Sequence, residues 1–232
     1  MASSAEACFE LLTKFNVPTS ECIAPLVSKL LGMAILVGAI GLKLPQIINI
    51  YQTGDVEGLS PTSFYSEVPL VMSNVAYNYL QGNPFSSYGE NVFILVQNLV
   101  LVMLLWMFMK EKPTISHMIG VLGMFAAVGM GSMHLPKEYW YLLPLSNLPL
   151  LLASRIPQII QNFRNQSTGS LSLITNFLTF AGSLARVFTT IQEVGMDYSL
   201  LLGFFLGCST SGLLLLQILI YGNKKASKKK AQ

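Results

Sequence analysis

Long stretches without a charged residue dominate this chain, and they restrict it to one class of fold. Residues 139–154 and 198–223 contain no charge, and several segments reach the roughly 20 apolar residues that cross a bilayer as a helix. Only 11% of the 232 residues are charged and 52% are hydrophobic, whereas soluble domains carry about 25% charged residues. These features predict an all-α membrane protein that crosses the bilayer several times.

Seven membrane-spanning helices are expected from the apolar segments and the short Gly-, Asn-, Ser- and Pro-rich connections between them. Residues 1–21 are not expected to form a signal peptide, because Glu6, Glu10 and Lys14 interrupt the place of its apolar core. The first span is then expected to direct its own insertion. The predicted spans are Leu30–Gln52, Thr62–Gln81, Tyr88–Met109, Ile115–Met133, Tyr141–Phe163, Ser172–Gln192 and Ser199–Tyr221.

An internal repeat determines the expected architecture. Residues 43–51 (KLPQIINIY) recur as residues 155–163 (RIPQIIQNF), 112 positions later. Each copy has a basic residue, a Pro-Gln pair and an aromatic residue at the same places, and Leu59-Ser60 and Leu171-Ser172 match at the same offset. One Pro-Gln pair alone carries no information, but this combination at one fixed offset indicates a duplicated unit.

Each repeat holds three predicted spans, which is an odd number. Two such units joined directly would lie in opposite orientations, and the span 115–133 between them restores the same orientation to both. Parallel repeats of this kind are a known transporter plan. The predicted organisation is an N-terminal segment (1–29), a first three-helix repeat (30–109), a linker with transmembrane helix 4 (110–138), a second three-helix repeat (139–221) and a basic tail (222–232).

The distribution of Lys and Arg outside the spans predicts the orientation, because basic residues collect on the cytosolic side. With the C-terminus in the cytosol, the opposite side holds only Lys14, Lys29 and Lys137, and the N-terminal segment is lumenal. The cytosolic set is Lys110, Lys112, Arg164, Lys224, Lys225, Lys228, Lys229 and Lys230.

The last four residues, Lys229-Lys230-Ala231-Gln232, resemble a sorting signal. Lysines at the fourth and third positions from the end match the dilysine retrieval signal of endoplasmic-reticulum membrane proteins, which a receptor reads in the cytosol. The tail therefore predicts the endoplasmic-reticulum membrane. The alternative is a basic flank that contacts the membrane surface.

Four ionisable side chains lie inside predicted spans: Lys43, Glu67, Arg155 and Arg186. Each costs about 2.5–3.5 kcal/mol at a helix centre. The similar depths of Lys43 and Glu67 predict an ion pair, whereas the repeat counterpart of Glu67 is Thr179, which leaves Arg155 without an acid there. The surplus of buried positive charge predicts an anionic, phosphate-class ligand at Arg155, Arg186 or Lys43. The alternative is structural ion pairing or snorkelling to an interface.

Pro45 and Pro157 are expected to interrupt their helices at matching places, because each removes a backbone hydrogen bond. The neighbouring Gln46 and Gln158 could bind the freed carbonyls or a ligand. This pattern predicts a hinge at the repeat interface, or a fixed kink needed only for packing. Polar residues on other spans line a central cavity or hold helices together: Asn74, Asn78, Gln97, Asn98 and Asn176.

Cys8 and Cys22 flank the segment before the first span, and in the oxidising lumen they predict a disulfide, with two free thiols as the alternative.

No catalytic constellation, metal-ligand spacing or nucleotide-binding loop appears in the sequence. We therefore expect no enzyme, no metal and no cofactor. The basic tail is too short to predict nucleic-acid binding.

The duplicated Pro-Gln motifs resemble the PQ-loop repeat superfamily, which includes sugar transporters and lysosomal amino-acid transporters. The resemblance covers nearly the whole chain after Lys29 and is closest to the mannose-P-dolichol utilization defect branch. Its most specific segments are residues 37–46, 83–90 and 182–193.

This resemblance implies a non-catalytic endoplasmic-reticulum protein needed for the use of dolichyl-phosphate mannose and dolichyl-phosphate glucose. These donors serve N-glycan precursors, GPI anchors and protein mannosylation. The implied partners are membrane lipid, dolichyl-phosphate sugars and glycosyltransferases of the endoplasmic reticulum, and the protein binds, presents or translocates the lipid. The alternatives are a PQ-loop transporter of a small solute, a sugar or an amino acid, and a structural partner of glycosyltransferases.

Overall fold

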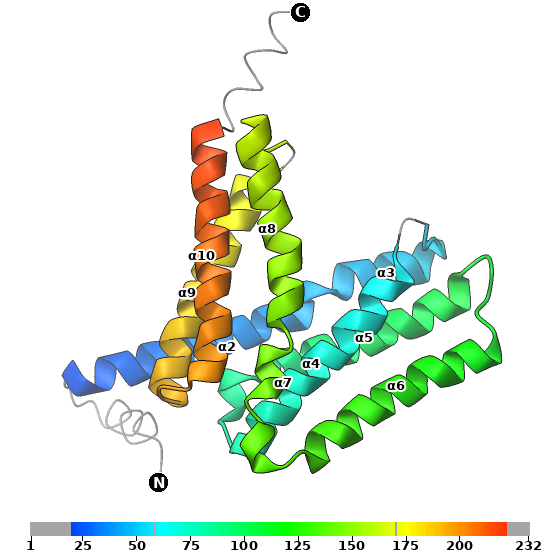
Figure 1. Ribbon diagram of the computed structural model, residues 1–232, viewed down its shortest axis with the longest axis horizontal. Helices are drawn as coiled ribbons and strands as arrows, with labels where there is room; N and C mark the ends of the chain where they lie inside the picture. The colour runs from blue at the N-terminus through cyan, green and yellow to red at the C-terminus, as the bar shows by residue number, and fades with distance from the viewer. Residues whose placement is uncertain (1–19, 58, 170, 222–232) are drawn as a thin grey trace, which may run out of the picture. The chain divides into compact units, whose positions relative to one another are not determined.

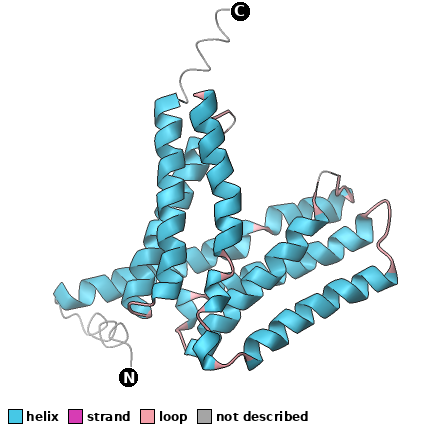
Figure 2. Ribbon diagram, in the orientation of Figure 1, coloured by secondary structure: helices cyan, strands magenta, loops and turns pink. Residues whose placement is uncertain are grey.

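The computed structural model describes residues 20–57, 59–169 and 171–221, and within these ranges the chain forms helices and no strands (Figures 1 and 2). The helices, in chain order, are α2 (Ser20–Leu42), α3 (Leu44–Thr53), α4 (Pro61–Gln81), η1 (Phe85–Ser87), α5 (Gly89–Phe108), α6 (Ile115–His134), η2 (Lys137–Tyr139), α7 (Leu142–Leu145), α8 (Leu148–Asn165), α9 (Leu173–Glu193) and α10 (Tyr198–Tyr221).

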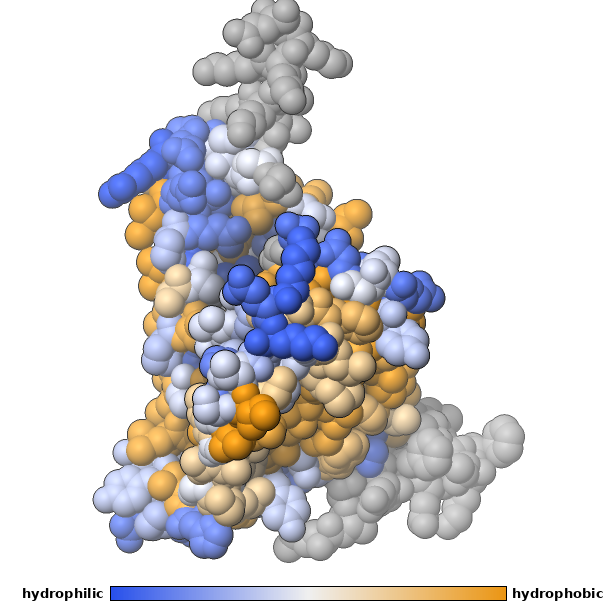
Figure 3. Space-filling view, turned by 90° about the vertical axis from the view of Figure 1, so that its right-hand side faces the viewer, coloured by the Kyte–Doolittle hydropathy of each residue, from blue (hydrophilic) through white to orange (hydrophobic). Residues whose placement is uncertain are grey.

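The composition of these helices confirms an all-α membrane protein. Among the described residues, four segments are long and apolar enough to cross a membrane: Cys22–Thr53, which joins α2 and α3, and the helices α5, α6 and α10. The other predicted spans correspond to α4, α8 and α9, which carry the charges at Glu67, Arg155 and Arg186. Large apolar side chains are exposed on many helix surfaces, and orange hydrophobic residues cover much of the face shown in Figure 3. Such surfaces suit contact with lipid.

The chain divides into two compact units, and the helix between the repeats belongs to the first of them. The first unit holds α2 to α7 together with residues 192–194, and the second holds α8, α10 and α9 up to Ile191. Helix α6 contacts α4, which explains why the predicted linker joins the first unit, and α7, from the start of the predicted second repeat, also contacts α4. The second unit begins at Asn147, whereas the sequence predicted a second repeat from residue 139.

In both units the third helix of the repeat contacts the other two. In the first unit, α5 contacts α2, α3 and α4. In the second unit, α10 contacts α8, and a Cβ atom built on Gly212 of α10 would lie 3.2 Å from the Phe180 ring of α9. A polar residue on the third helix is therefore placed to reach both neighbours.

The helices that carry the Pro-Gln pairs end in the same backbone conformation at matching positions. Gly54 follows α3 with φ 64°, and Gln166 follows α8 with φ 48°. Each donates its N–H to the carbonyl four residues earlier, on Ile50 and Asn162 respectively. These left-handed caps lie 112 positions apart, so the duplication extends to the backbone geometry.

Two predicted helix boundaries need correction. Helix α2 begins at Ser20 and not at Leu30, because a helix can continue beyond the apolar segment from which a span is predicted. The predicted fifth span, Tyr141–Phe163, is not one helix: α7 ends at Leu145 and α8 begins at Leu148. Pro149 explains the break between α7 and α8, because it has no N–H to donate to the preceding turn and suits the first turn of a new helix.

Candidate functional site

Lys43 lies at a break in the first helix of the first repeat. Helix α2 ends at Leu42 and α3 begins at Leu44, with Pro45 in the first turn of α3. The Lys43 N–H donates to Oε1 of Gln97 at 2.9 Å. The same Gln97 amide donates from Nε2 to the carbonyls of Ala39 and Ile40, both at 2.9 Å. Gln97 therefore replaces the helical hydrogen bond that would join the Lys43 N–H to the Ala39 carbonyl.

The Lys43 side chain is held by groups from two other helices. Its Nζ lies 2.7 Å from Oε1 of Glu67 on α4 and donates to Oδ1 of Asn98 on α5 at 2.5 Å. It also lies 5.7 Å from the centroid of the Phe64 ring, within the range of a cation–π contact. The structure thus brings together the predicted ion pair and adds a buried amide to it. The charge of Lys43 is compensated inside its own repeat.

Arg155, the repeat counterpart of Lys43, has a different environment. The positions that match Glu67 and Asn98 are Thr179 and Thr210. Both hydroxyls donate to carbonyls of their own helices, on Thr175 at 2.8 Å and on Leu206 at 2.8 Å. Among the described residues, none makes a hydrogen bond or an ion pair with the half-buried Arg155. The second repeat therefore has a cation that its own side chains do not neutralise.

The second Pro-Gln pair does not interrupt its helix, which corrects the prediction for Pro157. Helix α8 runs without a break from Leu148 to Asn165, with Pro157 in its interior. A proline removes only one helical hydrogen bond, and a helix can tolerate that loss. The break at Pro45 is different because Gln97 supplies a donor and an acceptor to the separated backbone. The counterpart of Gln97 is Ser209, whose side chain is too short for that role.

The remaining predicted polar residues hold local structure together. Asn78 donates to Oδ1 of Asn74 one turn away at 3.0 Å, and its own Oδ1 accepts from Asn83 at 2.8 Å. Asn176 donates to the carbonyl of Ser172 within its own helix. The side chains of Asn74, Asn78 and Asn176 thus make hydrogen bonds within α4 and α9 or to the residues next to them. These contacts do not join them to Lys43.

The positions of the other predicted site residues say less about a ligand. Arg186 is buried on α9, at 6% exposure. Gln46 is half-buried on α3, and among the described residues none hydrogen-bonds its side chain. Cys22 is buried and disulfide-bonded, whereas its predicted partner Cys8 lies outside the described residues. The predicted retrieval signal, Lys229 and Lys230, also lies outside them.

A protein-family model described as PQ loop repeat matches this chain twice, at residues 27–87 and 139–199. The two matches together cover more than half of the 232 residues. They begin 112 positions apart, which is the offset of the Pro-Gln segments. The chain belongs to the PQ-loop repeat family. The duplication predicted from the sequence is thereby confirmed.

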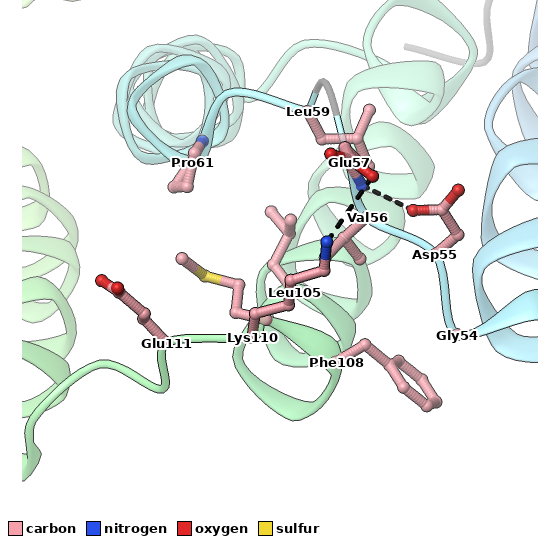
Figure 4. Close-up of a pocket in the computed structure, with 11 residues that line it drawn as sticks. Gly54, Asp55, Val56, Glu57, Leu59, Pro61, Leu105, Phe108, Lys110 and Glu111 are labelled. Carbon is pink, nitrogen blue, oxygen red and sulfur yellow. Dashed lines mark hydrogen bonds and ion pairs between the residues drawn. The ribbon is translucent and has the colours of Figure 1, made fainter.

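Each PQ-loop repeat has a hollow beside the loop that follows its first helix. In the first repeat, a pocket of about 290 Å³ lies between residues 54–61 and the end of α5. We call it the acidic pocket, because Asp55, Glu57 and Glu111 line it with a single cation, Lys110 (Figure 4). Lys110 points toward Glu57, at 3.7 Å, and both side chains are largely exposed. An exposed pair of this kind contributes little to stability.

The matching hollow of the second PQ-loop repeat has no charged lining. It has a volume of about 610 Å³ and lies along the end of α8 and the loop after it. We call it the amide groove, and its polar lining residues are Gln158, Gln161, Asn162, Asn165, Ser167 and Thr168. Gln158, the glutamine of the second Pro-Gln pair, thus opens onto a neutral polar surface.

The role of Gln97 could not be assigned from the sequence. The sequence predicts for it, as for four asparagines, only that it lines a cavity or joins helices. Its distinguishing feature was the adjacent pair Gln97-Asn98 in the middle of an otherwise apolar span. Two neighbouring amides at that depth are costly unless they are hydrogen-bonded, and here both accept from Lys43, Gln97 from its backbone N–H and Asn98 from its ammonium, while Nδ2 of Asn98 has no hydrogen-bond partner among the described residues.

Proposed function

We propose that this chain is a non-catalytic membrane protein of the endoplasmic reticulum that binds dolichyl-phosphate sugars. It makes dolichyl-phosphate mannose and dolichyl-phosphate glucose usable as donors for N-glycan precursors, GPI anchors and protein mannosylation. The observation that carries the proposal is the contrast between two equivalent cations. Lys43 is paired with Glu67 at 2.7 Å, whereas Arg155 meets no acid among the described residues.

The chemistry of Arg155 supports a phosphate ligand. A guanidinium in a membrane span is expensive unless an anion accompanies it. Its planar fork matches two phosphate oxygens, which a lysine ammonium does not. Dolichyl-phosphate sugars carry one such phosphate at the junction of an apolar chain and a polar head, and so suit a cation placed inside a span.

The surface of α8 supports a ligand that is partly lipid. Ile156, Ile160 and Phe163 are exposed on this helix, at 44%, 45% and 64%. They recur at helical spacing and form an apolar stripe, while Arg155 and Gln158 lie on another side of the helix. A helix with an exposed apolar stripe beside a polar one can contact both parts of an amphipathic lipid.

The proposed location rests on the lysine tail. Lys229 and Lys230 match a dilysine retrieval signal, provided that they stand fourth and third from the end of the mature protein, on its cytosolic side. Replacing both with Ser should release part of the protein to later compartments, as measured by the processing of an N-glycan engineered into the lumenal segment. Full retention of the variant would mean that partners, and not the tail, hold the protein in place.

The decisive experiment is reconstitution into vesicles with labelled dolichyl-phosphate mannose. Binding and transbilayer movement are measured separately, because presentation requires only the first and translocation requires both. Wild type should bind the lipid, and Arg155→Gln should lose most of that binding. Wild-type vesicles that bind no more labelled lipid than empty vesicles would contradict the proposal.

The second candidate function is transport of a small solute. The duplicated PQ-loop repeats favour it, because rocking of one repeat against another is a known route for transport. Uptake of free mannose or amino acids into the same vesicles, without any binding of the dolichyl lipid, would support this alternative. A purely structural partner of glycosyltransferases would show neither activity.

A further inference from the structure

The amide groove and Arg155 lie in succession on one side of α8. Gln158 and Asn162 follow Arg155 by three and seven residues, a spacing that places all three on one face of a helix. Arg155 precedes Gln158 by less than one turn, or about 4.5 Å along the axis. Arg155 itself does not line the groove; it lies less than one turn before Gln158 on the same helix face, and the neutral lining extends from Gln158 toward the loop after α8.

The groove offers hydrogen-bonding groups that its own repeat does not use. Among the described residues, none hydrogen-bonds the side-chain amides of Gln158, Gln161 or Asn165. Each amide provides two donors and one acceptor. The hydroxyls of Ser167 and Thr168 add further donors and acceptors to the same lining. The volume of about 610 Å³ is within the range of small-ligand sites.

One wall of the groove is held firmly. Asn162 is buried and donates to Oε1 of Gln217 on α10 at 3.0 Å. Gln217 in turn donates to the carbonyl of Ile159 at 2.9 Å. These two bonds hold this wall of the groove against α10. Fixed donors and acceptors bind a ligand with a smaller loss of entropy.

The corresponding hollow of the first repeat would reject the same ligand. Asp55 and Glu57 stand at the repeat positions of Ser167 and Gly169, and Lys43 is already paired. The two repeats have thus diverged in charge at the same two places. Within the described residues, the second repeat presents a neutral, hydroxyl- and amide-lined groove on the same helix face as a cation that no described side chain neutralises.

We propose that the amide groove binds the sugar ring of a glycosyl phosphate whose phosphate is bound by Arg155. An uncharged ring with many hydroxyl groups matches amide and hydroxyl partners, and the adjacent anion matches the guanidinium. The inference rests on the proposed function for its lipid-linked form, because a free hexose phosphate carries the same chemistry. The groove therefore selects the sugar, and Arg155 selects the phosphate.

The test compares three probes on full-length protein in vesicles: dolichyl-phosphate mannose, dolichyl phosphate without sugar, and mannose 1-phosphate. Gln158→Leu with Gln161→Leu removes two amides and should weaken mannosyl-lipid binding about tenfold while leaving dolichyl phosphate binding unchanged. Arg155→Gln should weaken the binding of all three probes. The control is Gln52→Leu, an exposed glutamine on α3 that is not among the residues that line the groove. Gln161→Leu alone is a milder second variant, because that side chain is exposed on α8.

The possible outcomes separate this inference from the proposed function. If mannose 1-phosphate binds and depends on the two glutamines but the mannosyl lipid does not bind, the groove is supported and the lipid function is overturned. If the mannosyl lipid binds but the double variant weakens it no more than it weakens dolichyl phosphate, the groove is overturned and the lipid function stands. If wild type binds none of the probes, both are overturned.

Discussion

The side-chain amide of Gln97 takes the place of a missing helical hydrogen bond at Lys43. Its Oε1 accepts the Lys43 N–H at 2.9 Å, and its Nε2 donates to the Ala39 carbonyl that this N–H would otherwise reach. Gln97, on α5, thereby bridges the break between α2 and α3 and fixes the backbone that carries the Lys43 ammonium.

Gln97→Leu should destabilise the protein by about 1–3 kcal/mol, because it leaves the Lys43 N–H and the Ala39 carbonyl unsatisfied in a buried place. Thermal unfolding in detergent measures the change. The exposed Gln52→Leu is the control. A Gln97→Leu protein as stable as wild type would show that the break needs no bridge.

Lys43→Gln should lower the amount of folded protein in cells. It leaves Glu67 without its cation and removes a donor from Asn98. The loss should be about 1–3 kcal/mol and less than for a fully buried pair, because the Glu67 side chain is 38% exposed. The double variant Lys43→Gln with Glu67→Gln should recover much of the abundance. No recovery would mean that Lys43 acts through the amide of Asn98 and not through the ion pair.

Arg155→Gln should impair function and not the amount of folded protein, in contrast to Lys43→Gln. No acid is left unpaired, so abundance should stay near normal, while the use of dolichyl-phosphate sugars should fall. Arg155→Lys should restore only part of it, because an ammonium lacks the two-pronged geometry for phosphate. The measurement is the length of the glycan precursor in deficient cells that express each variant at matched levels. Full-length precursors with Arg155→Gln would make Arg155 a structural or snorkelling residue.

Gln166→Gly should stabilise the protein by about 1 kcal/mol. Gln166 adopts φ 48°, a left-handed conformation that costs a residue with a side chain about 1–2 kcal/mol. Its repeat counterpart, Gly54, provides the matched opposite change. Gly54→Ala should destabilise, because its φ is 64° and an added Cβ would lie 3.3 Å from the Phe108 ring. Melting temperatures of both variants in one detergent check the pair of signs.

Asn165 should carry no glycan, although Asn165-Gln166-Ser167 is an acceptor sequence. The proposed topology puts this loop in the cytosol, away from the glycosylation machinery. Asn165 and Ser167 also line the amide groove, so a glycan there would fill it. Mass spectrometry of the purified protein, or a mobility shift after glycosidase treatment, checks the site. A glycan on Asn165 would invert the topology.

Several features of the fold could be predicted because they depend on local or repeated patterns. Apolar segments of span length predict helices in a membrane, and the match of residues 43–51 with 155–163 predicts the duplication. The meeting of Lys43 with Glu67 could also be predicted, because two opposite charges at similar depth on consecutive helices attract strongly where water is scarce.

The sequence by itself determined the helical membrane class, the duplicated repeat and the position of its buried charges, since these follow from composition and spacing along the chain. Only the tertiary structure decided what each charge contacts. Two equal Pro-Gln pairs gave a broken helix at Lys43 and a continuous one at Pro157. The difference depends on whether a third helix presents an amide long enough to replace a lost backbone bond, as Gln97 does and Ser209 does not. That outcome depends on how the helices rotate and pack, because hydrogen bonds form only within about 3 Å and at favourable angles.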